Sequence, residues 1–233
     1  MPGQSCLPKH TGIFFNGSFS EGDTRLQSRN PATGEEILEV SGASPTMVDQ
    51  VVEHASQAQP GWWNLDVRER VACVRNFIHQ IEKHGDELAM LDAIDSGNPY
   101  KGMLIDIKIT LGVMDLFTGL ATEIKGASFP GSSDRINFSV REPLGVVARI
   151  VPFNHPMMFT CIKSVAPLIA GNAVIIKPSE HTPLSALRIA ELAGKLFPPG
   201  TTAYVYPGAG EDRPRHLLFL IFPSRSLFYL HHF

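Results

Sequence analysis

The stretch Leu144-Gly145-Val146-Val147-Ala148-Arg149-Ile150-Val151-Pro152 begins the segment of the sequence that decides the fold. Residues 145–151 form an almost unbroken apolar run, which is typical of a strand covered on both faces in a parallel sheet. The patterns that follow predict a helix from about Pro156 to Ala170, a strand from Ala173 to Lys177, a helix from Thr182 to Phe197 and a strand from Ala203 to Tyr206. This βαβαβ order predicts an α/β fold with half of a doubly wound nucleotide-binding sheet.

The region before residue 143 is predicted to be mostly helical. Apolar residues flank Asn16-Gly17, which favours a hairpin over residues 12–20 because both residues of the pair tolerate positive φ. Residues 30–34 (Asn-Pro-Ala-Thr-Gly) favour a second turn. Cap residues and apolar residues at helical spacing predict helices after Ser44-Pro45, after Asp66, from about Asp86 to Gly97 and from about Lys101 to Ile124.

The pattern changes twice more along the chain. From Arg135 to Arg141 apolar and polar residues alternate, which predicts a half-exposed strand able to pair with a partner chain. After Asp212 the sequence combines bulky apolar clusters with Arg and His and shows no sustained periodicity, so it is assigned no structural role. We therefore divide the chain into residues 1–142, a nucleotide-binding unit over 143–212 and a tail over 213–233.

Composition excludes several classes of protein. The 233 residues are 43% apolar and 18% charged and carry a net charge of -3, so a nucleic-acid binder is disfavoured. The three cysteines, Cys6, Cys73 and Cys161, are far apart, which argues against a disulfide framework and favours a reducing, cytoplasmic location. The longest apolar run, Leu217 to Phe222, is too short to span a membrane. We expect a soluble protein without a membrane partner.

The loop Pro152-Phe153-Asn154-His155-Pro156 follows the first strand of the βαβαβ unit, at the sheet edge where such folds bind ligands. An Asn carboxamide there can donate a hydrogen bond to a developing oxyanion, and the two prolines hold the loop in one shape. The alternative is a stiff turn with a capping Asn. From spacing alone the two interpretations stay open.

The loop Lys177-Pro178-Ser179-Glu180 lies at the equivalent edge and offers a cation, a hydroxyl and a carboxylate that could bind ribose hydroxyls. Its alternative is a surface turn whose charges face water. Lys163 could be buried with a lowered pKa or could reach solvent along the helix. Gly208-Ala209-Gly210 could allow close approach of a phosphate, although the third glycine of the dinucleotide fingerprint is absent.

Other catalytic signatures are weak or absent. The sequence contains no GxxxxGK[ST], HExxH or GxSxG motif, and His231-His232 lacks further ligands nearby, so no metal site is predicted. Cys161 falls in an apolar helix and is interpreted as a core residue. Candidate chemistry is therefore confined to the sheet-edge loops and the helix that carries Lys163.

Five segments together resemble the aldehyde dehydrogenase superfamily, and in particular the bacterial betaine-aldehyde and general aldehyde dehydrogenases. They follow one another in family order and at family spacing: residues 30–35 (NPATGE), 141–147 (REPLGVV), 152–156 (PFNHP), 166–174 (APLIAGNAV) and 176–185 (IKPSEHTPLS). The resemblance runs from about Gly12 to Gly210. It corresponds to the amino-terminal half of a family chain, with a helical region followed by a partial Rossmann-like sheet.

The resemblance implies oxidation of a small-molecule aldehyde to a carboxylic acid with NAD or NADP, in a homo-oligomeric protein. It implies that Asn154 stabilises the oxyanion, that Lys163 relays protons, and that Lys177 and Glu180 contact the adenosine ribose. The alternating strand at 135–141 matches part of the family's oligomerisation hairpin. The residues expected at the cofactor are Ile150, Pro152, Phe153, Asn154, Lys177, Ser179, Glu180, Gly208 and Gly210.

The family's nucleophilic cysteine and general-base glutamate come later in its members than the position of Gly210. Neither Cys161 nor Phe117-Thr118-Gly119 matches a catalytic motif by position, and the tail after Asp212 does not resemble the family. Two interpretations follow from the sequence. The chain is either part of an aldehyde dehydrogenase, or an inactive truncated fragment or non-catalytic assembly partner.

Overall fold

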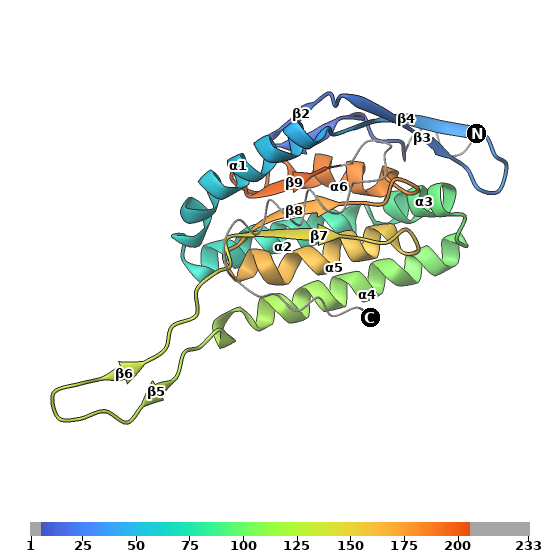
Figure 1. The fold of residues 1–233 in the computed structure, drawn as a ribbon. Coiled ribbons are helices and arrows are strands. Elements are labelled where there is room, and N and C mark those ends of the chain that lie inside the picture. The colour runs from blue at the N-terminus through green and yellow to red at the C-terminus, as the bar shows by residue number, and fades with distance from the viewer. Residues whose placement is uncertain (1–5, 206–233) are drawn as a thin grey trace.

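The computed structural model describes residues 6–205, and its centre is a five-stranded sheet with helices on both faces (Figure 1). The strand order is β2-β1-β9-β8-β7. The strands are β1 (Ile13–Phe15), β2 (Ser18–Ser20), β7 (Val146–Ile150), β8 (Ala173–Lys177) and β9 (Thr202–Tyr204). The amino-terminal hairpin and the last described strand therefore belong to one sheet.

The predicted βαβαβ unit is confirmed. Strands β7, β8 and β9 are parallel and are joined by α5 (Pro156–Ile169) and α6 (Leu184–Ala193). The second helix ends earlier than expected, at Ala193 and not near Phe197. Gly171, with φ of 87°, turns the chain from α5 into β8, a conformation that glycine adopts without steric cost.

The two faces of the sheet contact different helices. Alternate residues of β8 point to opposite faces, so Ala173 and Ile175 pack with α1 (Pro45–Trp63), whereas Val174 and Ile176 pack with the cluster formed by the other helices. All four side chains are fully buried. Both faces of the central strand are therefore covered, as the sequence predicted for a parallel strand.

Strand β7 differs from the prediction. Its residues are only partly buried and Ile150 is exposed, because β7 lies at the end of the sheet and not within it. The expectation of a strand covered on both faces was wrong for this position. An apolar run shows that both faces of a strand suit burial, but it does not show whether the covering elements are present.

The helical region follows the predicted caps. It comprises α1, α2 (Val67–Lys83), α3 (Gly85–Ser96) and α4 (Tyr100–Gly119). Ser44 accepts a hydrogen bond from Met47 N, Asp66 and Glu69 form a capping box, and Gly97 ends α3 in the left-handed conformation. The fourth helix ends at Gly119, and a short 3₁₀ helix, η2 (Ala121–Glu123), replaces the predicted last turn.

Two hairpins lie outside the central sheet. The predicted turn at residues 30–34 connects β3 (Thr24–Arg29) to β4 (Glu36–Gly42), two strands that the sequence analysis did not predict. The alternating segment forms β6 (Asn137–Phe138), which pairs with β5 (Ser128–Phe129) in a ribbon that projects from the body (Figure 1). Its apolar residues are exposed, with 84% of Ile136 and 72% of Val140 accessible. The strand is therefore shorter than predicted and is exposed on both faces in the single chain, while its pairing with a partner chain stays a prediction.

Within residues 6–205 no helix is long and apolar enough to cross a membrane. The same residues contain no group of three or more His, Cys, Asp or Glu side chains that could hold a metal ion.

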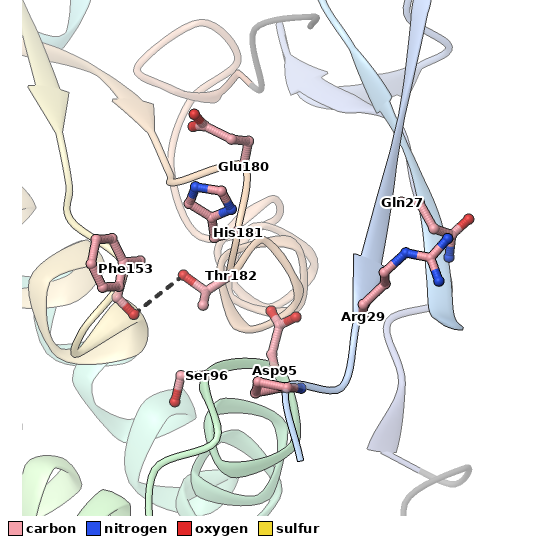
Figure 2. A pocket seen from close by; sticks show the side chains of 9 residues that line it. Gln27, Arg29, Asp95, Ser96, Phe153, Glu180, His181 and Thr182 are labelled. Carbon is pink, nitrogen blue, oxygen red and sulfur yellow. Dashed lines mark hydrogen bonds between the residues drawn. The ribbon is translucent and has the colours of Figure 1, made fainter. Parts of the chain in front are cut away.

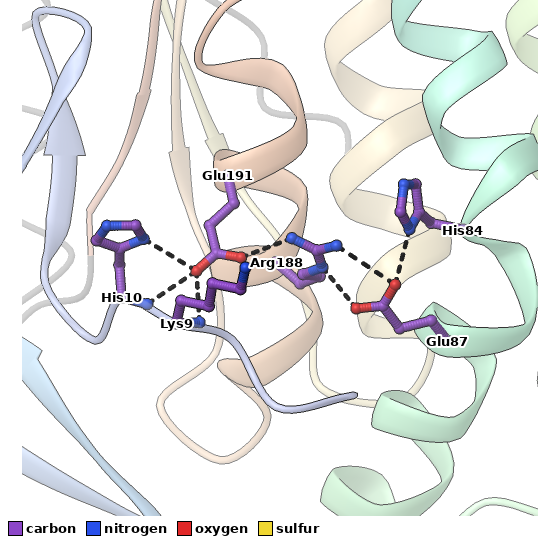
Figure 3. A network of polar contacts seen from close by, with 6 residues as sticks. All are labelled: Lys9, His10, His84, Glu87, Arg188 and Glu191. Atoms are coloured by element: carbon purple, nitrogen blue, oxygen red, sulfur yellow. Dashed lines mark hydrogen bonds and ion pairs between the residues drawn. The ribbon is translucent and has the colours of Figure 1, made fainter. Parts of the chain in front are cut away.

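A network of ionic contacts joins the amino-terminal segment to α6 and α3 (Figure 3). Arg188 on α6 is bonded to Glu87 at 2.6 Å and to Glu191 at 2.7 Å. Glu191 in turn accepts hydrogen bonds from the backbone N–H groups of Lys9 and His10, at 2.6 and 2.8 Å. Burial raises the pKa of Glu87, but the hydrogen bonds and charges of Arg188 and His84 lower it by more than burial raises it. The net pKa of Glu87 is therefore below the ordinary value.

We expect Arg188→Met to lower the free energy of unfolding by about 2 kcal/mol, because it leaves two partly buried carboxylates without their shared cation. Urea unfolding at neutral pH measures the change. Arg75→Met is the matched control, since Arg75 is exposed on α2, and it should change stability by less than about 0.5 kcal/mol. Equal effects of the two substitutions would contradict a stabilising role for the network.

Candidate functional site

The candidate site lies at the carboxyl ends of β7 and β8, where parallel sheets of this kind bind ligands. The loop after β7 and the loop after β8 meet there and face the β3 strand and the end of α3 (Figure 2). A cavity of about 350 Å³ opens between these elements. It is lined by Gln27, Arg29, Pro31, Asp95, Ser96, Phe153, Glu180, His181 and Thr182.

Lys177 and Glu180 form an ion pair in the loop after β8. Lys177 is buried, and its Nζ lies 3.3 Å from Glu180 Oε2 while donating a hydrogen bond to Pro178 O at 3.1 Å. Burial raises the pKa of Glu180, but a backbone hydrogen bond and the cation of Lys177 lower it more, so its net pKa is below the ordinary value. The structure thus keeps Glu180 ionised at the rim of the cavity. The alternative interpretation of this loop, a surface turn whose charges face water, does not hold for Lys177, because its side chain is buried.

The loop that carries Asn154 is held from α4, from the turn between α3 and α4, and from the neighbouring loop. Asn98 Nδ2 donates to the backbone oxygen of Asn154 at 2.7 Å, and His155 Nδ1 lies 2.6 Å from Asp106 Oδ2 on α4. Thr182 Oγ1 donates to Phe153 O at 3.5 Å (Figure 2). Asn154 itself is exposed. The loop backbone is therefore fixed while its carboxamide remains accessible to a ligand.

Two buried carboxylates beneath the loops were not predicted from the sequence. On α3, Asp92 Oδ2 accepts the backbone N–H of Met157 at 3.0 Å, and Asp95 Oδ2 accepts that of Leu184 at 2.9 Å. They cap the first turns of α5 and α6, whose preceding residues supply no side-chain cap. Two features of the sequence could have indicated these long-range caps. The helices α5 and α6 have no capping side chain of their own, and α3 carries aspartates on its buried face.

Burial raises the pKa of both carboxyls. The pKa of Asp92 rises to about 7, since burial outweighs the hydrogen bond from Met157 and the charges of Asp95 and Asp106 raise it further. Burial likewise raises the pKa of Asp95 to about 6, against the opposing hydrogen bonds from Ser28 and Leu184. Near neutral pH these two groups therefore bind protons more readily than exposed aspartates do.

The remaining predicted residues are distributed around the site. Ser179 is buried, and its hydroxyl oxygen accepts a hydrogen bond from the His181 N–H at 3.2 Å. The hydroxyl therefore stabilises the conformation of its own loop. Ile150, Pro152 and Phe153 are exposed beside the loop after β7. Lys163 is exposed on α5, which agrees with the interpretation that it reaches solvent. Gly208 and Gly210, like the tail over 213–233, lie outside the described residues.

The cysteines do not have the surroundings of activated nucleophiles. Cys161 is fully buried in α5, and burial, with a contribution from the charge of Asp92, raises the pKa of its thiol strongly. Burial is also the largest cause of the raised pKa values of Cys6 and Cys73. Because the thiolate is the reactive form, all three are poorly suited to covalent catalysis. The interpretation of Cys161 as a core residue is confirmed.

This arrangement can recognise a polar ligand that carries hydroxyl groups. A buried ammonium, an ionised carboxylate and an accessible carboxamide come from adjacent loops at one edge of the sheet. The ammonium can donate hydrogen bonds to a hydroxyl oxygen, the carboxylate can accept them, and the carboxamide can donate to a carbonyl or oxyanion.

Known proteins match this chain over most of its length. A model described as "Aldehyde dehydrogenase family" matches residues 19–218. Aldehyde dehydrogenase tropH of Talaromyces stipitatus is 38% identical over 215 residues, which cover 90% of this chain and 42% of that protein. The chain therefore spans less than half the length of this curated relative.

Solved structures agree with the sequence matches. PnpE, known from Pseudomonas sp. WBC-3 and solved in complex with nicotinamide adenine dinucleotide, is 35% identical with a TM-score of 0.84. Aldehyde dehydrogenase from Bacillus cereus, solved as an NAD+ complex, is 33% identical with a TM-score of 0.83. The matches cover 89% and 88% of this chain, and 43% of each of those chains.

Proposed function

Because this chain belongs to the aldehyde dehydrogenase family, we propose that it supplies the NAD(P)-binding and oxyanion-stabilising part of an enzyme that oxidises an aldehyde to a carboxylic acid. The observation that carries the proposal is the Lys177–Glu180 pair at the carboxyl end of β8, beside an open cavity. Relatives solved with nicotinamide adenine dinucleotide support the choice of cofactor.

The residues present fit the adenosine end of this cofactor. Lys177 Nζ can donate to a ribose hydroxyl oxygen, while Glu180 accepts a hydrogen bond from a hydroxyl. The pair is bonded within the loop before any ligand binds, so little ordering of side chains opposes binding. When bound, the nicotinamide of the cofactor accepts a hydride.

Asn154 is proposed to act on the aldehyde oxygen. Its carboxamide N–H groups donate to the oxyanion that develops when a nucleophile attacks the carbonyl carbon. Such a donor is effective only if it is already in place, and the contacts of the loop with Asn98 and Asp106 restrict its movement. Lys163, exposed on the helix after the loop, is the proposed proton relay.

The thiol nucleophile is proposed to come from the portion of the relatives that this chain does not match. Cys161 is enclosed by the core, and its raised pKa disfavours the thiolate that would attack an aldehyde. We expect Cys161→Ala to leave any aldehyde oxidation by this chain unchanged. Turnover that disappeared in the Cys161→Ala variant would overturn this assignment.

Nucleotide titration tests the proposed cofactor site. We expect AMP and NAD to bind with similar, weak affinities, because the described pair contacts the adenosine end. Lys177→Met should weaken AMP binding about tenfold or more, since a hydrogen bond from a charged group contributes about 1.5 to 3 kcal/mol. Calorimetry measures both affinities.

Lys195→Met is the matched control for that titration, because Lys195 is an exposed lysine after α6, away from the loop. It should bind AMP as the unmodified chain does. A nanomolar NAD site, or AMP binding that is indifferent to Lys177→Met, would show that the ligand is held elsewhere.

A further inference from the structure

The imidazole of His155 carries a polar atom that the loop contacts do not use. Its Nδ1 lies 2.6 Å from Asp106 Oδ2, and only 8% of the Asp106 side chain is accessible. A carboxylate oxygen accepts hydrogen bonds and cannot donate them, so Nδ1 carries the proton. In the neutral ring Nε2 is then an acceptor, as in other histidines oriented by a carboxylate. No group within residues 6–205 donates a hydrogen bond to it.

The orientation of this acceptor is fixed by the packing of the ring. Phe159, one turn along α5, makes an edge contact with the His155 ring, with the ring centroids 6.1 Å apart. The backbone oxygen of His155 accepts the Phe159 N–H at 3.1 Å. Because Nδ1 is bonded to Asp106, Nε2 points away from that carboxylate, and 38% of the His155 side chain remains accessible. The ring is therefore held in place before any ligand binds.

His155 lies at the end of the site that the proposed function assigns to the aldehyde. It directly follows Asn154, the proposed donor to the aldehyde oxygen. Phe153 contacts the loop after β8, through Thr182 Oγ1 and through an edge contact with the His181 ring, whereas His155 contacts α4. A hydroxyl of the adenosine ribose, held by that loop, is thus on the other side of the chain from Nε2.

The exposed residues beside the histidine and aspartate are apolar. Ile105 and Ile109 lie on either side of Asp106 along α4 and are 57% and 47% accessible, and Phe159 is half-buried. A ligand that covers an acceptor in such surroundings loses affinity if it cannot donate a hydrogen bond to it. A carboxylate on the ligand is disfavoured as well, because its oxygens and Nε2 are all acceptors.

We propose that His155 Nε2 accepts a hydrogen bond from a hydroxyl group of the substrate, which makes hydroxylated aldehydes the substrate class of this site. Asp106 is the positioning residue that keeps the proton on Nδ1. The inference rests on the proposed function, because it takes Asn154 as the group that binds the aldehyde oxygen. A site that bonds a substrate hydroxyl rejects the analogue lacking it more strongly than an apolar pocket rejects an added group.

The test measures the binding of three aromatic aldehydes to the full 233-residue chain at pH 8, without nucleotide. We expect meta-hydroxybenzaldehyde to bind about fivefold more tightly than benzaldehyde, and meta-carboxybenzaldehyde to bind more weakly than benzaldehyde. Nitrogen NMR of the histidine rings follows the titration. The spectrum before any addition also shows which nitrogen of His155 carries the proton.

Substitutions of His155 separate the hydrogen bond from the packing of the ring. His155→Phe keeps an aromatic ring and removes Nε2, so the preference for the hydroxyl should disappear while benzaldehyde binds as before. His155→Gln supplies an amide oxygen as acceptor and should restore part of the preference. His79→Phe is the matched control, because His79 is exposed on α2, and it should leave all three affinities unchanged. Circular dichroism verifies that each variant is folded.

Three results would overturn the inference and leave the proposed function in place. They are equal affinities for the three aldehydes, a preference for the hydroxyl that His155→Phe retains, and tightest binding of the carboxylate, which would mean that both ring nitrogens carry protons. Failure of the proposed function gives a different result. None of the three aldehydes then binds, or Asn154→Ala leaves their binding unchanged, and the inference falls with it.

Discussion

Replacing Arg70 by methionine is expected to lower the free energy of unfolding by about 3 to 5 kcal/mol. The buried guanidinium of Arg70 donates to Trp63 O, in the last residue of α1, at 2.8 Å and to Leu65 O, just after that helix, at 2.5 Å. It also donates to Ile169 O, at the end of α5, at 3.1 Å. These carbonyls lie at or just beyond helix ends, where no helical N–H satisfies them. Methionine fills the space of the side chain but leaves three acceptors without their donor.

The measurement is urea unfolding of the full chain, followed by far-ultraviolet circular dichroism. Arg68→Met is the matched control, because Arg68 lies on the same helix and is exposed. It should change the free energy of unfolding by less than about 0.5 kcal/mol. A loss below about 1 kcal/mol for Arg70→Met would mean that water or neighbouring groups replace the guanidinium.

Asp92→Asn is expected to remove most of the loss of stability that the unmodified chain shows as pH rises from 5 to 8. The pKa of Asp92 is about 7 in the folded protein, against 3.8 for an ordinary aspartate. Between these values the folded chain binds a proton that the unfolded chain has released, so the contribution of Asp92 to stability is greatest below pH 4 and is lost as pH rises through 7. Asparagine cannot ionise, and its oxygen can still accept the Met157 N–H.

At pH 8 Asp92→Asn should be more stable than the unmodified chain by up to about 4 kcal/mol, because each pKa unit corresponds to about 1.4 kcal/mol. At pH 4.5 the difference should be small. Asp95, with a pKa of about 6, retains a pH dependence of the same sign in the variant. Urea unfolding across this pH range measures both curves.

Asp49→Asn is the control for the pH experiment, because Asp49 is exposed on α1. Its curve should run parallel to that of the unmodified chain. Parallel curves for Asp92→Asn as well would show that Asp92 is already ionised in the folded state near neutral pH.

The sequence predicted those elements whose signals are local. The hairpin at Asn16-Gly17, the capping box at Asp66 and the buried strand at 173–177 each depend on residues within one short segment, and each is confirmed. Strand β3 was missed because its inward positions include Ser28, which bonds Asp95 at 2.6 Å and breaks the apolar alternation. A polar side chain whose partner lies far along the chain carries no local signal of its own burial.

For the site, the sequence placed Asn154, Lys177 and Glu180 at one sheet edge, and the parallel pairing of β7 with β8 supports that placement. It did not reveal how the loops are held. Three of the groups that hold them, Asp92, Asp95 and Asp106, lie on α3 and α4, and Asn98 lies in the turn between these helices. All four are distant in sequence from their partners, which are backbone groups or a histidine in other elements. Spacing within one segment cannot report such contacts.

The aspartate caps on α3 also constrain the order in which the chain can fold. The cap of α5 joins residues 65 positions apart and that of α6 residues 89 apart, so neither helix has its first turn completed until α3 has docked. Long-range contacts of this kind slow folding, because the intervening loops must close before the bonds form. We therefore expect α5 and α6 to complete their first turns only once they pack against α3.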